Sequence, residues 1–176
     1  SIYLLTKNLI KRQRQDIIFL MIFSSIQLVD AILWKNKMKK NKINYYLTSY
    51  IIPLILSLQI IYNVFFINTN VPSYILLPAI LNIVYLFFYY NSSYTIPSKN
   101  LFKSPLWGGK KTIPIYMILF GILIFYGRIG LSGWKLINSV LLVLSLSLSF
   151  LFSGGFGTLW CAFANIVGLY YLFIYG

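Results

Sequence analysis

Residues 17–34 read IIFLMIFSSIQLVDAILW, an apolar stretch that follows Asp16 and ends at the lysine-rich block Lys35–Lys42. Eighteen residues of α-helix rise about 27 Å, close to the roughly 30 Å hydrocarbon core of a bilayer. A continuous apolar run of this length between charged flanks is typical of a membrane-spanning helix. The stretch therefore predicts a helical membrane protein.

The composition of the whole chain favours the same class. Hydrophobic residues make up 59% of the 176 residues and charged residues only 10%, whereas about 25% of the residues of a soluble domain are charged. In lipid, only helices and closed barrels satisfy the backbone, and a barrel needs alternating segments of about ten residues. The apolar stretches do not alternate in this way, so we expect an all-α, polytopic transmembrane helix bundle.

Apolar stretches recur along the chain and define one expected helical domain over residues 1–176. The six expected spans are 17–34, 50–67, 74–90, 113–126, 136–152 and 156–175. The apolar segment Ser1–Leu5 precedes basic residues and has the character of the end of an earlier helix, which predicts a seventh span at the N-terminus. We expect at least five crossings and no sheet, with 91–112 as a longer loop.

The formal net charge of +13 is spread over short basic blocks between the apolar stretches. Such blocks leave no room for a nucleic-acid-binding module, so we expect contacts with anionic lipid head groups and none with nucleic acid. Six alternating spans place nine basic residues on the side of the 35–42 and 91–112 loops and six on the other. The positive-inside rule puts these two loops on the cytoplasmic or equivalent face.

The residues needed for common catalytic sites are missing from the sequence. It contains no histidine, and Cys161 is its single cysteine. This excludes histidine-based triads, histidine-ligated metals and an internal disulfide. No phosphate-binding glycine motif occurs either. We therefore expect no catalytic residues, no metal and no cofactor.

Polar residues inside the expected spans are the candidate functional residues, because polar groups are costly at membrane depth. Gln27 and Asp30 share one face of the first span, and Gln59 and Asn63 are four residues apart in the second. We expect these four side chains to meet in one buried polar cluster. It is either a hydrogen-bonded lock between helices or a site for a proton, a cation or a lipid head group. In one form of the lock, Asp30 lies near the membrane interface and pairs with Lys35 or Lys37.

Small residues recur at four-residue spacing in the last two expected spans. This spacing allows helices to approach closely, so we expect the two spans to pack together. The helix-packing residues are Ser145, Ser149, Ser153, Gly157, Cys161 and Asn165. Tyrosines and tryptophans, including Trp107, are interpreted as interfacial belts.

Three segments resemble an uncharacterised family of multi-pass membrane proteins from giant viruses (nucleocytoplasmic large DNA viruses) and protists. They are Phe23–Asp30, Leu58–Gln59 with Asn63, and Gly157–Cys161. The resemblance implies about seven helices and no known activity. The chain departs from the family pattern in the reversed order of Gln27 and Asp30, in Ile60 where the family has proline, and in its lack of histidine.

The function that we expect is non-enzymatic: a structural or assembly subunit of a membrane or membrane-bound particle, in a viral internal membrane or an organelle membrane. Its expected partners are membrane lipids and either other membrane subunits or copies of itself. A small transporter or channel with a polar site around Asp30 is the alternative. A lipid-modifying membrane enzyme is the second alternative.

Overall fold

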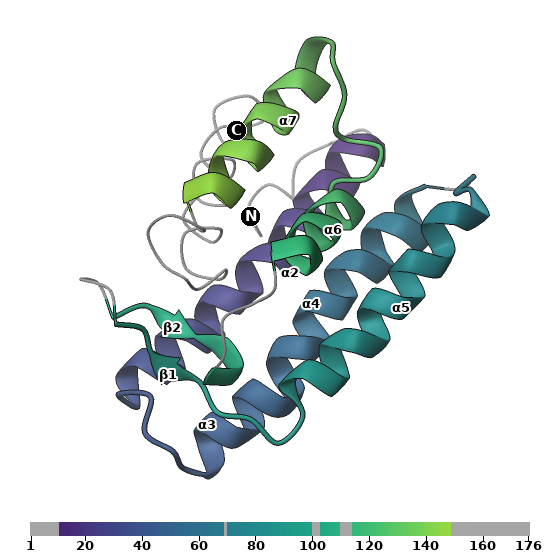
Figure 1. The fold of residues 1–176 in the computed structure, drawn as a ribbon. Coiled ribbons are helices and arrows are strands. Elements are labelled where there is room, and N and C mark those ends of the chain that lie inside the picture. The colour runs from purple at the N-terminus through teal and green to yellow at the C-terminus, as the bar shows by residue number, and fades with distance from the viewer. Residues whose placement is uncertain (1–10, 69, 100–102, 110–113, 149–176) are drawn as a thin grey trace.

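The computed structural model describes residues 11–68, 70–99, 103–109 and 114–148, most of them helical (Figure 1). The elements are α2 (Lys11–Lys35), α3 (Lys42–Tyr46), η1 (Leu47–Ile51), α4 (Ile52–Ile60), η2 (Ile61–Ile67), α5 (Ser73–Tyr90), β1 (Ile96–Pro97), β2 (Pro105–Leu106), η3 (Trp107–Gly109), α6 (Pro114–Ile124) and α7 (Gly133–Leu148). The segments α3, η1, α4 and η2 form one continuous helix, which we call the second long helix.

Three of the described helices are long and apolar enough to cross a membrane: Arg14–Lys35, Lys42–Ile67 and Ser73–Tyr90. They contain the first three expected spans, although the second helix begins at Lys42, before residue 50. The helix α6 lies within the fourth expected span, and α7 overlaps the fifth but begins before residue 136. Their 11 and 16 residues are fewer than the roughly 20 that are typical of one crossing. The sixth expected span and the N-terminal segment lie outside the described residues.

The second long helix contains two stretches of π-helix, η1 and η2, one on each side of α4. Pro53 stands at the start of α4 and has no N–H with which to bond the carbonyl four residues earlier. The wider turns of η1, just before it, make room for the proline ring without ending the helix. The buried residues Thr48 and Ser49 lie in η1, and the buried Asn63 lies in η2. The wide turns therefore occur where polar side chains enter the interior.

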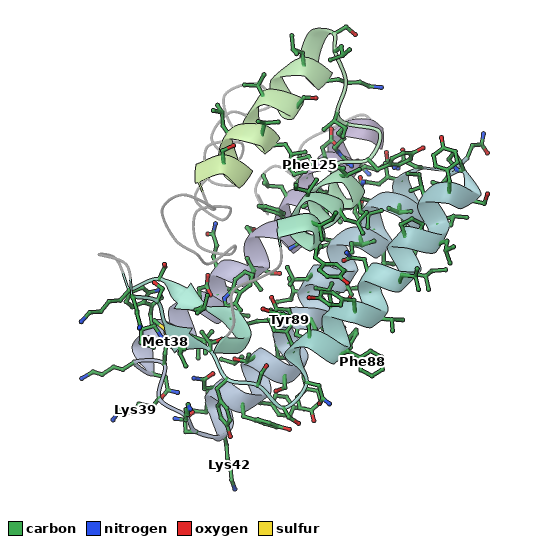
Figure 2. The ribbon with its side chains drawn as sticks, viewed as in Figure 1. Met38, Lys39, Lys42, Phe88, Tyr89 and Phe125 are labelled. Carbon is green, nitrogen blue, oxygen red and sulfur yellow. The ribbon has the colours of Figure 1, made fainter. Side chains whose placement is uncertain are left out.

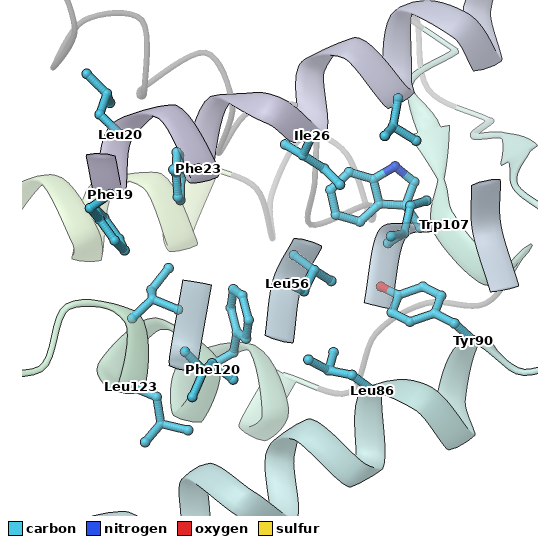
Figure 3. Close-up of a cluster of buried hydrophobic side chains, with 14 of the residues drawn as sticks. Phe19, Leu20, Phe23, Ile26, Leu56, Leu86, Tyr90, Trp107, Phe120 and Leu123 are labelled. Carbon is cyan, nitrogen blue, oxygen red and sulfur yellow. The ribbon is translucent and has the colours of Figure 1, made fainter. Parts of the chain in front are cut away.

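The helix α4 packs against both α2 and α5 and lies between them (Figure 1). Figure 3 shows the apolar cluster that these helices share with α6, including Phe23, Leu56, Leu86 and Phe120. The outward surface is apolar as well. Phe88, for example, is 76% exposed and points away from α5 (Figure 2). Helices that are apolar both inside and outside suit a lipid environment.

The expectation of no sheet was wrong in the 91–112 loop. Here β1 and β2 pair as a short antiparallel ladder, and Ser98 N donates to Ser104 O at 2.8 Å just beyond it. Ser98, Ser104 and Pro105 are buried, and a buried backbone needs hydrogen-bond partners. Strands of two residues are too short to leave an alternating pattern in the sequence.

The helix α2 ends in a Schellman turn. The backbone N–H of Met38 donates to Leu33 O, and that of Lys37 donates to Trp34 O, both at 2.8 Å. Leu33 and Met38 are buried, which is the apolar contact that accompanies this motif. Lys37 adopts the left-handed conformation, with φ 52, at the position where glycine is usual.

Candidate functional site

Asp30, one of the two acidic residues in the chain, is buried in α2 and only 7% exposed. Its Oδ1 accepts a hydrogen bond from Nε1 of Trp107, at 2.8 Å. Trp107 is 5% exposed, so both partners are shielded. A hydrogen bond to a carboxylate is among the stronger ones, and it offsets part of the cost of burying that group. The pair fixes the loop after α5 to the side of α2.

The backbone after Trp107 is shaped to bring the indole into the core. Gly108 has φ 73, and a Cβ built on it would stand 3.3 Å from Cδ1 of Tyr90. A larger residue would therefore be strained in its backbone and crowded by a buried ring. Figure 3 places Trp107 between Ile26 of α2 and Tyr90 of α5. The loop thus inserts Trp107 between two helices.

A second polar network holds the same loop against the start of the second long helix. Asn44 Nδ2 donates to Thr95 O at 2.8 Å, and Thr95 N donates to Asn44 Oδ1 at 2.9 Å. The Thr48 and Thr95 hydroxyls are 2.8 Å apart. Next to them, Ser49 Oγ accepts from Ser93 N at 3.1 Å. Because Asn44, Thr48 and Thr95 are fully buried, these bonds satisfy groups that water does not reach.

The opposite end of the bundle holds an ionic network around Arg128. Its Nη2 lies 2.8 Å from Asp16 Oδ1 in a salt bridge, and Nε donates to the same oxygen at 3.2 Å. Nη1 donates to Oδ1 of Asn63. The guanidinium also stands over the ring of Phe19, 4.8 Å from its centroid, a cation–π arrangement. One arginine thus joins α2, η2 and the turn after α6.

Asn63 also caps the C-terminus of α6. Its Nδ2 donates to Leu123 O at 2.9 Å and to Tyr126 O at 3.1 Å, two carbonyls at the end of the helix, where the regular intrahelical bonds stop. Asn68 adds a bond from its own Nδ2 to Asn63 O at 2.6 Å. A Cβ on Gly127, which has φ 77, would stand 2.6 Å from Asn68 Oδ1. Glycine is therefore required in this turn.

Four buried oxygen atoms of α4 and α5 have no hydrogen-bond partner in the structure. They are Ser57 Oγ, Gln59 Oε1, Asn82 Oδ1 and the Tyr85 hydroxyl. A buried polar atom without a partner is destabilising by about 1 to 3 kcal/mol. These atoms contrast with Asp30 and Asn63, whose hydrogen bonds connect separate elements.

The structure places the four expected cluster residues in different surroundings. Asp30 is buried, but the donor that reaches it is Trp107 rather than an amide of the second span. Asn63 bonds to α6 and Arg128, Gln59 Oε1 is unpaired, and Gln27 is half-buried. The reason is depth: Asp30 lies near the turn that joins two antiparallel helices, whereas Asn63 lies at the far end of the second one.

The variant in which Asp30 pairs with a lysine is not what the structure contains. Lys35 and Lys37 are exposed, and the salt bridge seen in the described residues joins Arg128 to Asp16. Trp107 was interpreted as part of an interfacial belt, and this was wrong because its side chain is buried.

The expected helix-packing stripe falls almost entirely beyond the part of the chain that the structure describes. Ser145 lies in α7, and its side chain is not among those described. Outside the described residues are Ser149, Ser153, Gly157, Cys161 and Asn165. The packing of the last two expected spans therefore stays a prediction.

Sequence reasoning missed three residues that carry the observed networks: Trp107, Arg128 and Asn44. Arg128 stands apart from the lysine blocks, next to glycine, which distinguishes it from a flanking charge. Asn44 and Thr48 are four residues apart on one helical face, a spacing identical to that of Gln59 and Asn63. For Trp107 the sequence carries no such signal, because its partner lies 77 residues away.

The arrangement is suited to holding helices and loops together. Each of the two carboxylates accepts a hydrogen bond from a distant part of the chain. Within the described residues, no group of three or more histidine, cysteine or acidic residues is placed to hold a metal ion. In the part of the chain that the structure describes, the polar contacts include hydrogen bonds between helices and loops and the ion pair of Arg128 with Asp16.

Comparisons with protein-family models, curated proteins and solved structures find no match to this chain. The resemblance to the giant-virus membrane family thus stays a prediction. The described part of the chain is mostly helical, with three helices that could cross a membrane and polar networks at both ends of the bundle.

Proposed function

We propose that this protein is a non-enzymatic, multi-pass integral membrane protein that serves as a structural or assembly subunit of a membrane or membrane-bound particle. One observation carries the proposal. The buried side chains of Asp30 and Asn63 form hydrogen bonds that connect separate elements, Asp30 with Trp107 and Asn63 with Arg128. Large apolar side chains cover the outward surface. Such a molecule is built to be stable in lipid and to present its helix faces.

The proposed topology has six spans in this chain, with α6, α7 and residues 156–175 crossing in addition to the three longer helices. The Lys35–Lys42 turn and the loop with β1 and β2 lie at one end, where Asn44 bonds to Thr95. The turn that carries Arg128 lies at the other end, beside Asn63. The positive-inside rule places the lysine-rich end on the cytoplasmic or equivalent face. The resemblance favours a viral internal membrane or an organelle membrane.

Cysteine accessibility tests this topology. In a Cys161→Ser background, single cysteines replace the exposed residues Lys39, Lys99, Asn70 and Leu131, and intact vesicles are treated with an impermeant maleimide. We expect Lys39→Cys and Lys99→Cys to react from one side, and Asn70→Cys and Leu131→Cys from the other. If Lys39→Cys and Leu131→Cys react from the same side, the six-span topology is excluded.

Assembly is tested by the size of the solubilised protein. The outer face of α5 carries a run of exposed apolar side chains, and the proposed subunit role predicts that helix faces of this kind contact neighbouring subunits. Cross-linking in native membranes followed by light scattering in detergent should show homo-oligomers or complexes with other membrane proteins. A strict monomer with no cross-linked partner contradicts the subunit role.

A transporter or channel is the second candidate, favoured by the unpaired buried oxygens of Gln59 and Asn82. Polar atoms of this kind inside membrane helices often belong to an ion or proton path. Liposomes that contain the protein should then conduct protons or monovalent cations, and Asp30→Asn or Gln59→Leu should abolish the flux. Liposomes with no flux above the protein-free background exclude this candidate.

A further inference from the structure

We propose that the lysine-rich end of the molecule binds the phosphate head groups of anionic phospholipids. This surface, here called the lysine platform, consists of the Lys35–Lys42 turn and the hairpin formed by β1 and β2, with Lys99 and Lys103 beside its strands. The inference rests on the proposed membrane insertion and adds to it a lipid class and the residues that select it.

The charge of the lysine platform is not balanced by any acid. The turn contributes five exposed lysines, and the hairpin contributes the exposed Lys99 and Lys103. No aspartate or glutamate follows Asp30 anywhere in the chain. Asp30 itself is buried and accepts the hydrogen bond of Trp107. Each lysine near an anionic membrane surface adds about 1 kcal/mol of attraction, so the platform favours anionic over zwitterionic lipid.

The two halves of the platform are held together by buried hydrogen bonds. The Nδ2 of Asn44 donates to Lys39 O in the turn, at 3.0 Å, and to Thr95 O in front of the hairpin, at 2.8 Å. Ser98 and Ser104 close the hairpin, with their hydroxyls 3.0 Å apart. The lysines therefore project from one preformed surface rather than from two independent loops.

Backbone strain marks two of these lysines. Lys37 has φ 52 and Lys103 has φ 46, a conformation in which glycine is favoured over any residue with a Cβ. Strained residues persist where the surrounding structure holds them, and they concentrate at functional sites. Lys37 occupies the C′ position of the Schellman turn, where glycine would be more stable, which points to a use for its charge.

The position of the lysine platform at the ends of the long helices indicates that its ligand is a lipid head group. The turn joins the ends of two membrane-length helices, and the aromatic side chains of Trp34 and Tyr46 are exposed next to it, at 42% and 62%. Exposed tryptophan and tyrosine at helix ends mark the level of the lipid head groups. Lysine stems run along apolar surface and carry the ammonium to this level. Figure 2 shows Lys39 and Lys42 pointing outward from this end.

The test uses the full chain in micelles of an uncharged detergent, and the thermal unfolding midpoint is measured as lipid is added. Phosphatidylglycerol should raise the midpoint, and about 0.5 M salt should remove most of this effect. At that salt concentration the Debye length is about 4 Å, so attraction between exposed charges that are farther apart is largely screened. Phosphatidylcholine and inorganic phosphate should leave the midpoint unchanged. Stabilisation by inorganic phosphate alone would replace the lipid surface with a free-anion site and overturn the proposal.

Variants locate the effect. The triple change Lys39→Gln, Lys40→Gln and Lys42→Gln should weaken the response to phosphatidylglycerol at least about tenfold, and the matching lysine-to-arginine triple should keep it. Arg14→Gln with Lys135→Gln, at the opposite end, is the control and should respond like the native chain. Equal responses from the platform and control variants would overturn the proposal.

Two glycine variants separate the charge of Lys37 from its backbone strain. Lys37→Gly should raise the midpoint without lipid, because glycine relieves the left-handed backbone, and should lower the response to phosphatidylglycerol. Ser92→Gly relieves the same strain, with φ 52 at Ser92, and changes no charge, so its lipid response should stay native. If Lys37→Gly responds to phosphatidylglycerol like the native chain, Lys37 is not part of the lipid-binding surface.

Carbonate extraction tests the proposed insertion separately. If carbonate releases the protein from membranes, the insertion is contradicted. If the protein stays in the membrane but responds equally to phosphatidylglycerol and phosphatidylcholine, only the preference for anionic lipid is contradicted.

Discussion

The two aspartates of this chain sit at opposite ends of the same helix and are stabilised in different ways. Asp16, near the start of α2, has a side chain that is 16% exposed and a guanidinium as its partner. Asp30 is more deeply buried, and its partner is the neutral N–H of an indole. Both partners lie far along the chain, and both bonds close a connection between distant segments.

The difference concerns what each bond does. An arginine neutralises a carboxylate and offers several further donors, so Arg128 joins three elements at once. An indole offers a single donor and a large apolar ring, so Trp107 seals a loop against the core and leaves the carboxylate with one hydrogen bond. The Asp16 end is thus an ionic junction, whereas the Asp30 end is a latch for one loop.

The largest effect is expected at the ionic junction. Arg128→Leu leaves Asp16 without its cation and Asn63 Oδ1 without its donor, and it removes the contact with Phe19. Breaking a buried pair is destabilising by about 3 to 5 kcal/mol, and partial exposure reduces this to about 2 to 4 kcal/mol. The free energy of unfolding in mixed micelles measures it, with the exposed Lys135→Leu as control. If Arg128→Leu lowers the free energy of unfolding no more than the control does, the ionic junction does not contribute to the stability of the bundle.

The latch should contribute less. Trp107→Phe keeps an aromatic ring in the core but deletes the donor to Asp30, which should lower the free energy of unfolding by about 1 to 3 kcal/mol. Asp30→Leu should also loosen the bundle, because Trp107 Nε1 is then buried without an acceptor. The double variant should be less destabilised than the sum of the two. Strict additivity would contradict a direct coupling between them.

Asp30→Asn separates charge from hydrogen bonding at the latch. The amide keeps an oxygen at the position of Oδ1 to accept from Trp107, so stability should change by less than about 1 kcal/mol. Assembly, followed by cross-linking, should remain normal. A destabilisation as large as that of Asp30→Leu would show that the stability of the latch requires the charge itself, whereas the flux assay described above tests whether Asp30 has a role in transport.

The smallest effect is expected at Gln59. Its Oε1 is buried without a partner. Replacing Gln59 with an apolar side chain of similar length therefore eliminates an unpaired polar atom, and no hydrogen bond to that oxygen is lost. Gln59→Met should therefore be neutral or stabilise the protein by up to about 1 kcal/mol. Asn63→Leu in the same helix is the contrast and should be clearly destabilising. Equal losses at both positions would contradict the different roles assigned to them.

Hydropathy was sufficient to place the long helices, because each apolar stretch is by itself long enough for a helix of membrane-spanning length. The expected spans 17–34, 50–67 and 74–90 all fall within observed helices. The pairing of polar residues was not predictable in this way. The sequence indicated that Asp30 is buried, because a carboxylate that faces hydrocarbon is costly. Nothing near Asp30 in the sequence indicates that Trp107 is its partner. The antiparallel turn at Lys35–Lys42 also places Asn63 at a different depth from Asp30. The hairpin strands were missed because two residues leave no period to detect.

The separation of the latch residues in sequence sets an order in which the molecule can be completed during synthesis. In the proposed insertion, Asp30 enters the membrane with the first long helix, but its donor is 77 residues further along and is made after two more helical segments. The partner of Asp16 is an arginine 112 residues away, which is made later still. A ribosome that pauses before residue 107 therefore holds a nascent chain whose two carboxylates still lack the partners that they have in the folded protein.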